Sequence, residues 1–255
     1  DYFLPFYPSL PFELVLVMVR EKIPKILKIG ENLKKHVKFI NIPLNVYKSL
    51  LNKLRIDYFP EFIMRNVGIR RSQGEFIACI TSDSVPNIQL YDSILHRQFN
   101  LNSYVRTYRK YSSQNKSIII DKLNYYSSKT SQNLIYHIEK TDFRNILNSK
   151  SCGDFQLTHW RIWKSVKGYI EGKEVFHIDS ALGLDLVALV PSPLLMKVIG
   201  FNLHLDHPKI SHRTYRFLYW NYLNMSEKGY ISANSYRFRN NWGLSYLSNL
   251  PKVYF

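Results

Sequence analysis

Short apolar runs separated by amphipathic stretches set the pattern of this chain. A run in which nearly every position is apolar predicts a strand covered on both faces. Such a run lies at 13–19, and further strands are expected at 37–42, 75–80 and 197–205, with a shorter one at 151–157. Stretches with helical character predict helices at 44–54, about 60–73, 87–99, 158–166 and 176–189. This alternation is typical of an α/β protein with a mostly parallel central sheet flanked by crossover helices.

Polar residues directly after the strand at 75–80 mark a candidate site. Thr81-Ser82-Asp83-Ser84 lies at the carboxyl end of that strand, where parallel sheets bind their ligands. The region 112–133 is rich in Ser, Asn and Lys, which predicts a loop or insertion. Neither a repeat nor a linker is evident, so residues 1–255 are expected to form one domain.

Composition favours a folded cytoplasmic protein. The contents of 45% hydrophobic and 21% charged residues are ordinary for a globular chain. Two cysteines, Cys79 and Cys152, make no disulfide framework and predict reduced thiols. The apolar region 181–201 is interrupted by an aspartate, two prolines and a lysine, which argues against a membrane span. The first residues do not match a signal peptide, and the missing initial Met favours a longer parent chain.

The net charge of +16 permits binding to nucleic acid, to an anionic membrane surface or to phosphorylated substrates. Its lysines and arginines are scattered, which favours a diffuse basic surface. The stretch Tyr104–Tyr111 interleaves tyrosines with basic residues, as a nucleic-acid-binding face would, but an ordinary edge strand gives the same pattern.

Several blocks resemble one enzyme family. The stretch 65–77 reads RNVGIRRSQGEFI and leads into a strand that ends in Ser82-Asp83-Ser84. It resembles the donor-binding half of GT-A fold glycosyltransferases of the family-two type, whose DXD-type motif is present here with one of its two usual acids. Further blocks follow in the order of a bacterial subgroup: CGDFQL at 152–157, KGYIE at 167–171, HIDS at 177–180, LHLDH at 203–207 and NWGL at 241–244.

The resemblance implies a single GT-A (Rossmann-like) domain. Its donor half would lie at about 11–100 and its acceptor half at about 134–250, with the polar insertion at about 112–133 between them. The family's usual opening strand is absent before Glu13, which implies either a truncated chain or a remnant of that region in 1–10.

The activity implied is metal-assisted transfer of a sugar from a nucleoside diphosphate to an acceptor hydroxyl. Mn²⁺ or Mg²⁺ suits carboxylate and phosphate oxygens and would act as a Lewis acid on the diphosphate. Asp83 is the predicted metal ligand, and the resemblance implies His204 or His207 as a second one. The structural alternative for Asp83 is a turn or cap residue before the helix at 87–99.

A carboxylate within reach of the acceptor hydroxyl would serve as general base. The resemblance places this base at Asp179, for which a helix N-cap role is the compatible alternative. Asp154 is the second candidate and is also predicted, with Trp242, to bind the acceptor. Similarity to inverting members implies a single in-line displacement.

The predicted donor contacts are Glu21, Asn66, Arg70 and Arg71. Guanidinium groups bind phosphate oxygens with two parallel hydrogen bonds. Neighbouring helical residues point about 100° apart, so at most one of Arg70 and Arg71 is expected to face the donor. The alternative is that both are solvated.

The sequence thus predicts a cytoplasmic transferase of polysaccharide biosynthesis that acts on a glycan or lipid-linked acceptor. Its charge is compatible with peripheral attachment at the inner face of a membrane, and no specific nucleic-acid partner is expected. The alternatives are a degenerate, non-catalytic glycosyltransferase relative and a basic nucleic-acid-binding protein.

Overall fold

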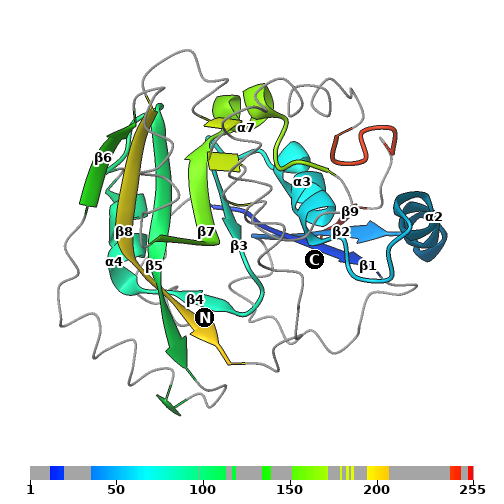
Figure 1. Cartoon of the computed structure of the whole chain (residues 1–255), viewed down its shortest axis with the longest axis horizontal. Coiled ribbons are helices and arrows are strands. Elements are labelled where there is room, and N and C mark those ends of the chain that lie inside the picture. Colours follow the sequence, from blue (N-terminus) through cyan, green and yellow to red (C-terminus); the bar gives the residue numbers. More distant parts are fainter. Residues whose placement is uncertain are drawn as a thin grey trace.

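The computed structural model describes residues 12–19, 36–96, 98–112, 117–118, 134–138, 151–171, 179, 182–183, 185–186, 194–206, 242–247 and 252–254. Within these residues, helices combine with a smaller and a larger β-sheet, so the expected α/β class is confirmed. Helix α3 (Glu61–Arg71) lies between the sheets and contacts β1 (Leu14–Val19) of the smaller one and β3 (Phe76–Ile80) of the larger (Figure 1).

The smaller sheet forms where the first two apolar runs predict strands. Strand β1 pairs parallel with β2 (Val37–Ile42), which pairs antiparallel with β9 (Lys252–Tyr254). Helix α2 (Leu44–Leu54) follows Pro43 and buries Leu50 in the core of this sheet, as its spacing predicts. Both strands and this helix begin or end within one residue of the predicted bounds.

Helix α3 packs closely on β1 because residue 68 is glycine. A Cβ atom there would lie 3.3 Å from Cγ2 of Val17, closer than side chains usually pack. The helix ends at Arg71, about two residues earlier than predicted, because Ser72 has extended backbone angles (φ −71°, ψ 148°).

The larger sheet has the strand order β3-β7-β5-β8-β4, and β6 also pairs with β8. Its other strands are β4 (Ser84–Pro86), β5 (Ser103–Ser112), β6 (Leu134–Ile138), β7 (Ser151–His159) and β8 (Leu194–Leu205). Strands β3 and β4 stand at opposite ends of this order, although only residues 81–83 separate them. A connection of that length spans no more than about 14 Å. The sheet therefore curls until its two edges meet, close to a barrel.

The pairing directions differ from the expected mostly parallel central sheet. In the larger sheet β5 and β8 are parallel, whereas the pairs β3–β7, β5–β7, β4–β8 and β6–β8 are antiparallel. An apolar run indicates that a strand is covered but not which way it runs. The edge-strand interpretation of Tyr104–Tyr111 is also wrong, because β5 lies inside the sheet between β7 and β8. Its arginines are accommodated there by carboxylate partners.

The helices around this sheet are shorter than predicted. Helix α4 (Ile88–Leu95) begins where the side-chain oxygen of Asn87 accepts a hydrogen bond from the Leu90 amide, and it ends before Phe99. Helix α7 (Trp160–Val166) directly follows β7. Residues 179, 182–183 and 185–186 are helical, and the rest of the helix predicted at 176–189 lies outside the described residues.

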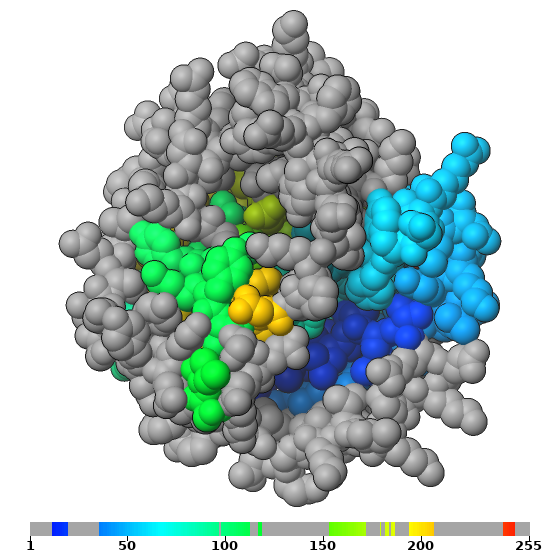
Figure 2. Space-filling model, turned by 60° about the horizontal axis from the view of Figure 1, so that its bottom comes forward, coloured from blue at the N-terminus to red at the C-terminus, as the bar shows by residue number. Residues whose placement is uncertain are grey.

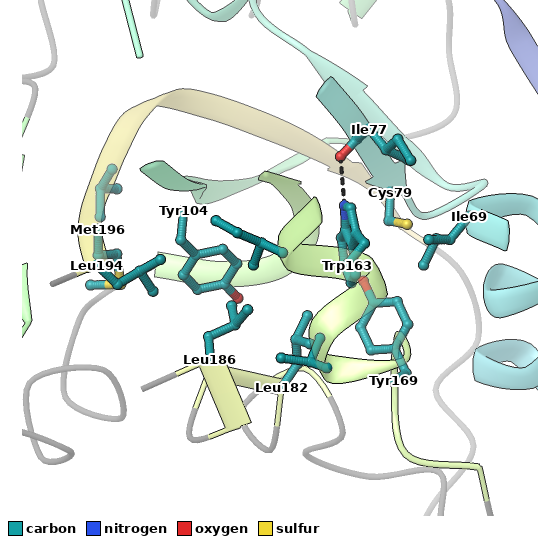
Figure 3. Close-up of a cluster of buried hydrophobic side chains, with 13 residues drawn as sticks. Ile69, Ile77, Cys79, Tyr104, Trp163, Tyr169, Leu182, Leu186, Leu194 and Met196 are labelled. Carbon is teal, nitrogen blue, oxygen red and sulfur yellow. Dashed lines mark hydrogen bonds between the residues drawn. The ribbon is translucent and has the colours of Figure 1, made fainter. Parts of the chain in front are cut away.

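The largest apolar cluster is built around Trp163 of α7. Its side chain is 0% exposed, and its ring nitrogen donates a 3.0 Å hydrogen bond to the carbonyl oxygen of Ile77 (Figure 3). Tyr169 packs beside it, and Leu182 and Leu186 complete the cluster. This core attaches α7 and the helical residues near 182 to the larger sheet.

Cys79 belongs to this cluster, and burial raises the pKa of its thiol to about 11. At pH 8 only about one such thiol in a thousand is ionised, and the thiolate is the reactive form. In a Cys152→Ser variant, whose remaining thiol is Cys79, we expect Ellman's reagent to react only after unfolding in guanidinium. Complete labelling within minutes in native buffer would contradict the buried position of Cys79.

None of the helices in the described parts of the chain is long and apolar enough to cross a membrane. The predicted loop at 112–133 lies almost entirely outside the described residues.

Candidate active site at the closure of the larger sheet

The turn between β3 and β4 fixes Asp83 where the sheet closes. The Thr81 amide donates to the Asp154 carbonyl of β7 (3.0 Å), and the Leu205 amide of β8 donates to the Asp83 carbonyl (2.8 Å). The hydroxyl groups of Thr81 and Ser84 lie 2.6 Å apart across the turn. The backbone around Asp83 is therefore held by β7 on one side and by β8 on the other. Figure 2 shows the ends of β5 (green) and β8 (yellow) reaching the surface together on one face.

His204 lies between two carboxylates at this closure. Its Nδ1 atom is 3.6 Å from Oδ1 of Asp83 and 3.8 Å from Oδ2 of Asp154. The edge of the Tyr111 ring packs at 89° to the imidazole, with 5.6 Å between the centroids. Both rings come from neighbouring residues of the β5–β8 pair, so the sheet register sets the position of His204.

An irregularity in β7 projects Asp154 into the site. The residue of β7 that pairs with β5 jumps from Gln156 to Cys152 over a single step of β5, which leaves residues 153–155 without a partner on β5. Such bulges commonly re-aim side chains next to functional sites. Arg109 donates to both oxygens of Asp154, through Nε to Oδ2 (2.5 Å) and through Nη2 to Oδ1. The Asp154 carboxylate is thus buried but neutralised by a charged partner.

The same irregularity makes room for Asp179. A Cβ atom on Gly153 would lie 2.3 Å from Cβ of Asp179, so a larger residue would push Asp179 away. Nη2 of Arg106, a residue only 3% exposed, is 3.4 Å from Oδ2 of Asp179, which remains partly open to solvent. Gln156 also donates to the Asp179 carbonyl (3.3 Å). These contacts hold Asp179 in place.

These residues meet some requirements of a divalent metal site. Two neighbouring ligands of a magnesium ion, each about 2.1 Å from it, lie about 3 Å apart. The separation of 3.6 Å between Asp83 and His204 is close to that spacing. Among the described residues no group of three or more His, Cys, Asp or Glu side chains could hold a metal ion. His207, the other predicted ligand, lies outside the described residues. Asp83 and His204 would therefore need oxygens of a bound diphosphate to complete the shell.

Asn66 does not lie beside Asp83, and its side chain forms hydrogen bonds with other parts of the protein. It is 0% exposed, and its side-chain amide donates to the Tyr169 carbonyl (2.8 Å) and to Oε1 of Glu171 (2.9 Å) while accepting from the Tyr169 amide (2.8 Å). The same Glu171 oxygen accepts from the Gly243 amide (2.6 Å). Gly168 (φ +71°) has no room for a Cβ atom beside the Asn66 side chain. Asn66 thus joins three segments that are distant in sequence.

Arg70 and Arg71 both contact the turn at 242–247. Arg71 donates to the carbonyl oxygens of Gly243 (2.7 Å), Leu244 (3.0 Å) and Leu247 (3.0 Å). Partial burial and the neighbouring Arg70 charge lower the pKa of Arg71. The Arg70 guanidinium lies over the Trp242 ring, 5.0 Å from its centroid. These residues flank the start of β3, so the structure does not bring them together with Asp83 at its end.

Of the predicted site residues, the structure brings together Asp83, His204 and Asp154, and it places Asp179 beside Gly153. Glu21 lies outside the described residues. Sequence reasoning missed Arg106 and Arg109, which bind two of these carboxylates. For Arg106 a signal was available, since a buried arginine among apolar positions of an interior strand requires a charged or polar partner. Treating 104–111 as an exposed edge concealed that requirement.

No family model and no curated protein matches this chain.

Proposed function

We propose that this chain is a metal-assisted glycosyltransferase that moves a sugar from a nucleoside diphosphate to an acceptor hydroxyl. One observation carries the proposal. Asp83 and Asp154, from blocks far apart in the sequence, lie on either side of His204 where the larger sheet closes, and Asp179 lies beside Gly153, the residue before Asp154. Sugar transfer needs a charged site for the diphosphate and a base for the acceptor, and these residues supply candidates for both.

Asp83 and His204 form the donor side of the proposed site. They would hold Mg²⁺ or Mn²⁺ together with the diphosphate, and the ion would offset charge on the phosphate oxygens. Because the backbone on both sides of Asp83 is already fixed by hydrogen bonds, its carboxylate is in position before a ligand arrives. Binding therefore loses no conformational entropy in ordering this turn.

Asp179 is the proposed general base. It takes the proton of the acceptor hydroxyl while that oxygen forms a bond to the anomeric carbon, and the nucleoside diphosphate leaves with the electrons of the broken bond. Arg106 orients the Asp179 carboxylate, and partial exposure leaves that carboxylate open to the acceptor. Asp154, held by Arg109, is assigned to acceptor binding because its carboxylate already has a strong cationic partner.

A GT-A fold is part of the proposal and draws support from how the family-like blocks pack. The helix that contains RNVGIRR leads into the strand whose end carries Asp83. Asn66 of that block binds Tyr169 and Glu171 of the KGYIE block, and Glu171 in turn binds Gly243 of the NWGL block. We assign Asn66 and Arg71 to holding these blocks together rather than to direct contact with the donor.

Calorimetric titration with UDP and GDP, in Mn²⁺ and in EDTA, tests the donor site. We expect metal-dependent binding of at least one nucleotide and a loss of about tenfold or more in affinity in Asp83→Asn, because the amide is a weaker metal ligand. Asp57→Asn, an exposed change after α2, is the matched control and should bind as the wild type does.

The titration also distinguishes an active enzyme from a degenerate relative. A folded wild-type protein that binds neither nucleotide under any metal condition would overturn the enzyme proposal and favour a degenerate relative. Metal-dependent binding that is equal in Asp83→Asn would keep the donor site but remove Asp83 from it.

A further inference from the structure

A second concave site lies at the opposite end of β3 from Asp83. It is a pocket of about 550 Å³, bounded by the C-terminal end of α3, the residues that connect α3 to β3, helix α7 and Trp242. Ligand sites in proteins commonly have volumes of this order, about 300–1,000 Å³. The side chains that give it its chemistry are Arg70, Gln73, Trp160, Lys164, Lys167 and Trp242.

The charge of this pocket is one-sided. Arg70, Lys164 and Lys167 contribute three positive charges, and none of the described residues that line it is acidic. Concave surfaces lined by one sign of charge concentrate the field and raise the local concentration of oppositely charged ligands. The pocket therefore favours an anion.

One aromatic side chain of the pocket, Trp160, is exposed to a ligand rather than buried. Trp160 is 39% exposed, whereas Trp163 on the same helix is fully buried. The Trp160 amide donates to the Glu75 carbonyl (2.9 Å), and the His159 ring nitrogen accepts from the Arg161 amide (3.2 Å), so the start of α7 is fixed. Lys164 and Arg161 each place a cationic group 5.6 Å from the centroid of the Trp160 ring. An exposed tryptophan beside a cation is suited to a ring that carries negative charge.

We propose that this pocket binds an acidic sugar unit, that is, a pyranose ring bearing a carboxylate or phosphate. The ring stacks on Trp160, and its anionic group is held by Arg70, Lys164 and Lys167. The preference for a ring-bearing anion rests on the pocket alone, and its assignment to a sugar rests on the proposed function. A single-stranded nucleic acid is less suited, because it needs a groove that follows several nucleotides.

The position of the pocket gives the sugar unit a role. The pocket lies at the start of β3, whereas Asp83 follows its end, so a ligand in the pocket is too far from Asp83 to take part in the sugar transfer. An acidic unit bound there would belong to the acceptor chain, some distance from the reacting hydroxyl. Binding energy from such remote parts of a substrate aligns the reacting end.

The test is a calorimetric titration of the full chain with a glucuronate-containing disaccharide and with glucose 6-phosphate, against neutral cellobiose. We expect the acidic probes to bind and cellobiose to bind about tenfold more weakly or not measurably. Trp160→Ala should weaken acidic-probe binding about tenfold, and Trp160→Phe, which keeps an aromatic face, by less than about threefold. Lys164→Gln should weaken binding of the acidic probes and lessen the salt dependence of that binding. Lys53→Gln, at an exposed position of α2, should change neither.

Three outcomes would overturn the inference: no binding of either acidic probe, equal binding by Trp160→Ala, or tighter binding of oligouridylate that grows with its length. Asp83→Asn separates this inference from the proposed function, because it should lose nucleotide affinity and keep the acidic sugar. Nucleotide binding without sugar binding refutes the pocket assignment alone. Sugar binding without nucleotide binding supports the pocket as an acidic-sugar site and refutes the donor site.

Discussion

Replacing Asp179 by asparagine should lower turnover by about a hundredfold to ten-thousandfold, the range lost when a general base is removed. The amide has nearly the same shape but cannot take the acceptor proton. Because Asp179 has no proposed contact with the donor, affinity for the nucleotide should stay within about threefold of the wild type. Sugar transfer to an acceptor and calorimetric titration with the nucleotide measure the two effects.

The control must separate lost chemistry from lost structure, since asparagine leaves the buried Arg106 without its charged partner. A melting temperature measured for the wild type, Asp179→Asn and the exposed Asp57→Asn shows whether folding changes. Wild-type turnover in a folded Asp179→Asn would exclude Asp179 as the base. If Asp154→Asn then abolished turnover while nucleotide binding persisted, the base would be Asp154, the second candidate from the sequence.

The strands and helices were largely predictable because their signal is local. The apolar runs at 14–19, 37–42 and 76–80 appear as strands within a residue of their predicted bounds. The helix ends were less well predicted, since they depend on single backbone contacts. Asn87 caps α4 as its residue type suggests, but the helix stops four residues before Phe99.

Strand direction and sheet closure were not predictable in the same way. They depend on which edges meet, and no periodicity within one strand specifies its neighbour. The irregularity at 153–155 illustrates this limit. Gly153 and Asp154 look like an ordinary strand entry in the sequence, yet in the structure they form the space for Asp179 and the ion pair with Arg109.

The acidic residues of the candidate site were predicted from the sequence, but its arginines were not. Asp83, Asp154 and Asp179 stood out because they lie in family-like blocks. Arg106 and Arg109 lie in no such block, and their roles are seen only in their contacts with Asp179 and Asp154. Asn66 is the opposite case. It lies in a family-like block and was predicted to contact the donor, but its side chain forms hydrogen bonds with Tyr169.

Trp163→Ala should destabilise the protein by about 3–5 kcal/mol, the range for removal of a large buried ring. Trp163 joins α7 to β3 through packing and through its hydrogen bond to the Ile77 carbonyl, which the alanine variant would leave without this partner. A loss of this size is a large part of the roughly 5–15 kcal/mol that stabilises a typical domain. Urea denaturation followed by circular dichroism measures the change in the free energy of unfolding.

Trp160→Ala is the matched control, since it removes the same side chain from an exposed position three residues earlier on the same helix. It should change the free energy of unfolding by no more than about 0.5 kcal/mol, as exposed substitutions usually do. If Trp163→Ala does not fold, Trp163→Phe, which keeps most of the packing and loses the hydrogen bond, should still show a smaller loss. Equal denaturation midpoints for Trp163→Ala and Trp160→Ala would contradict the core, because one ring is enclosed by the larger sheet and the other faces the pocket.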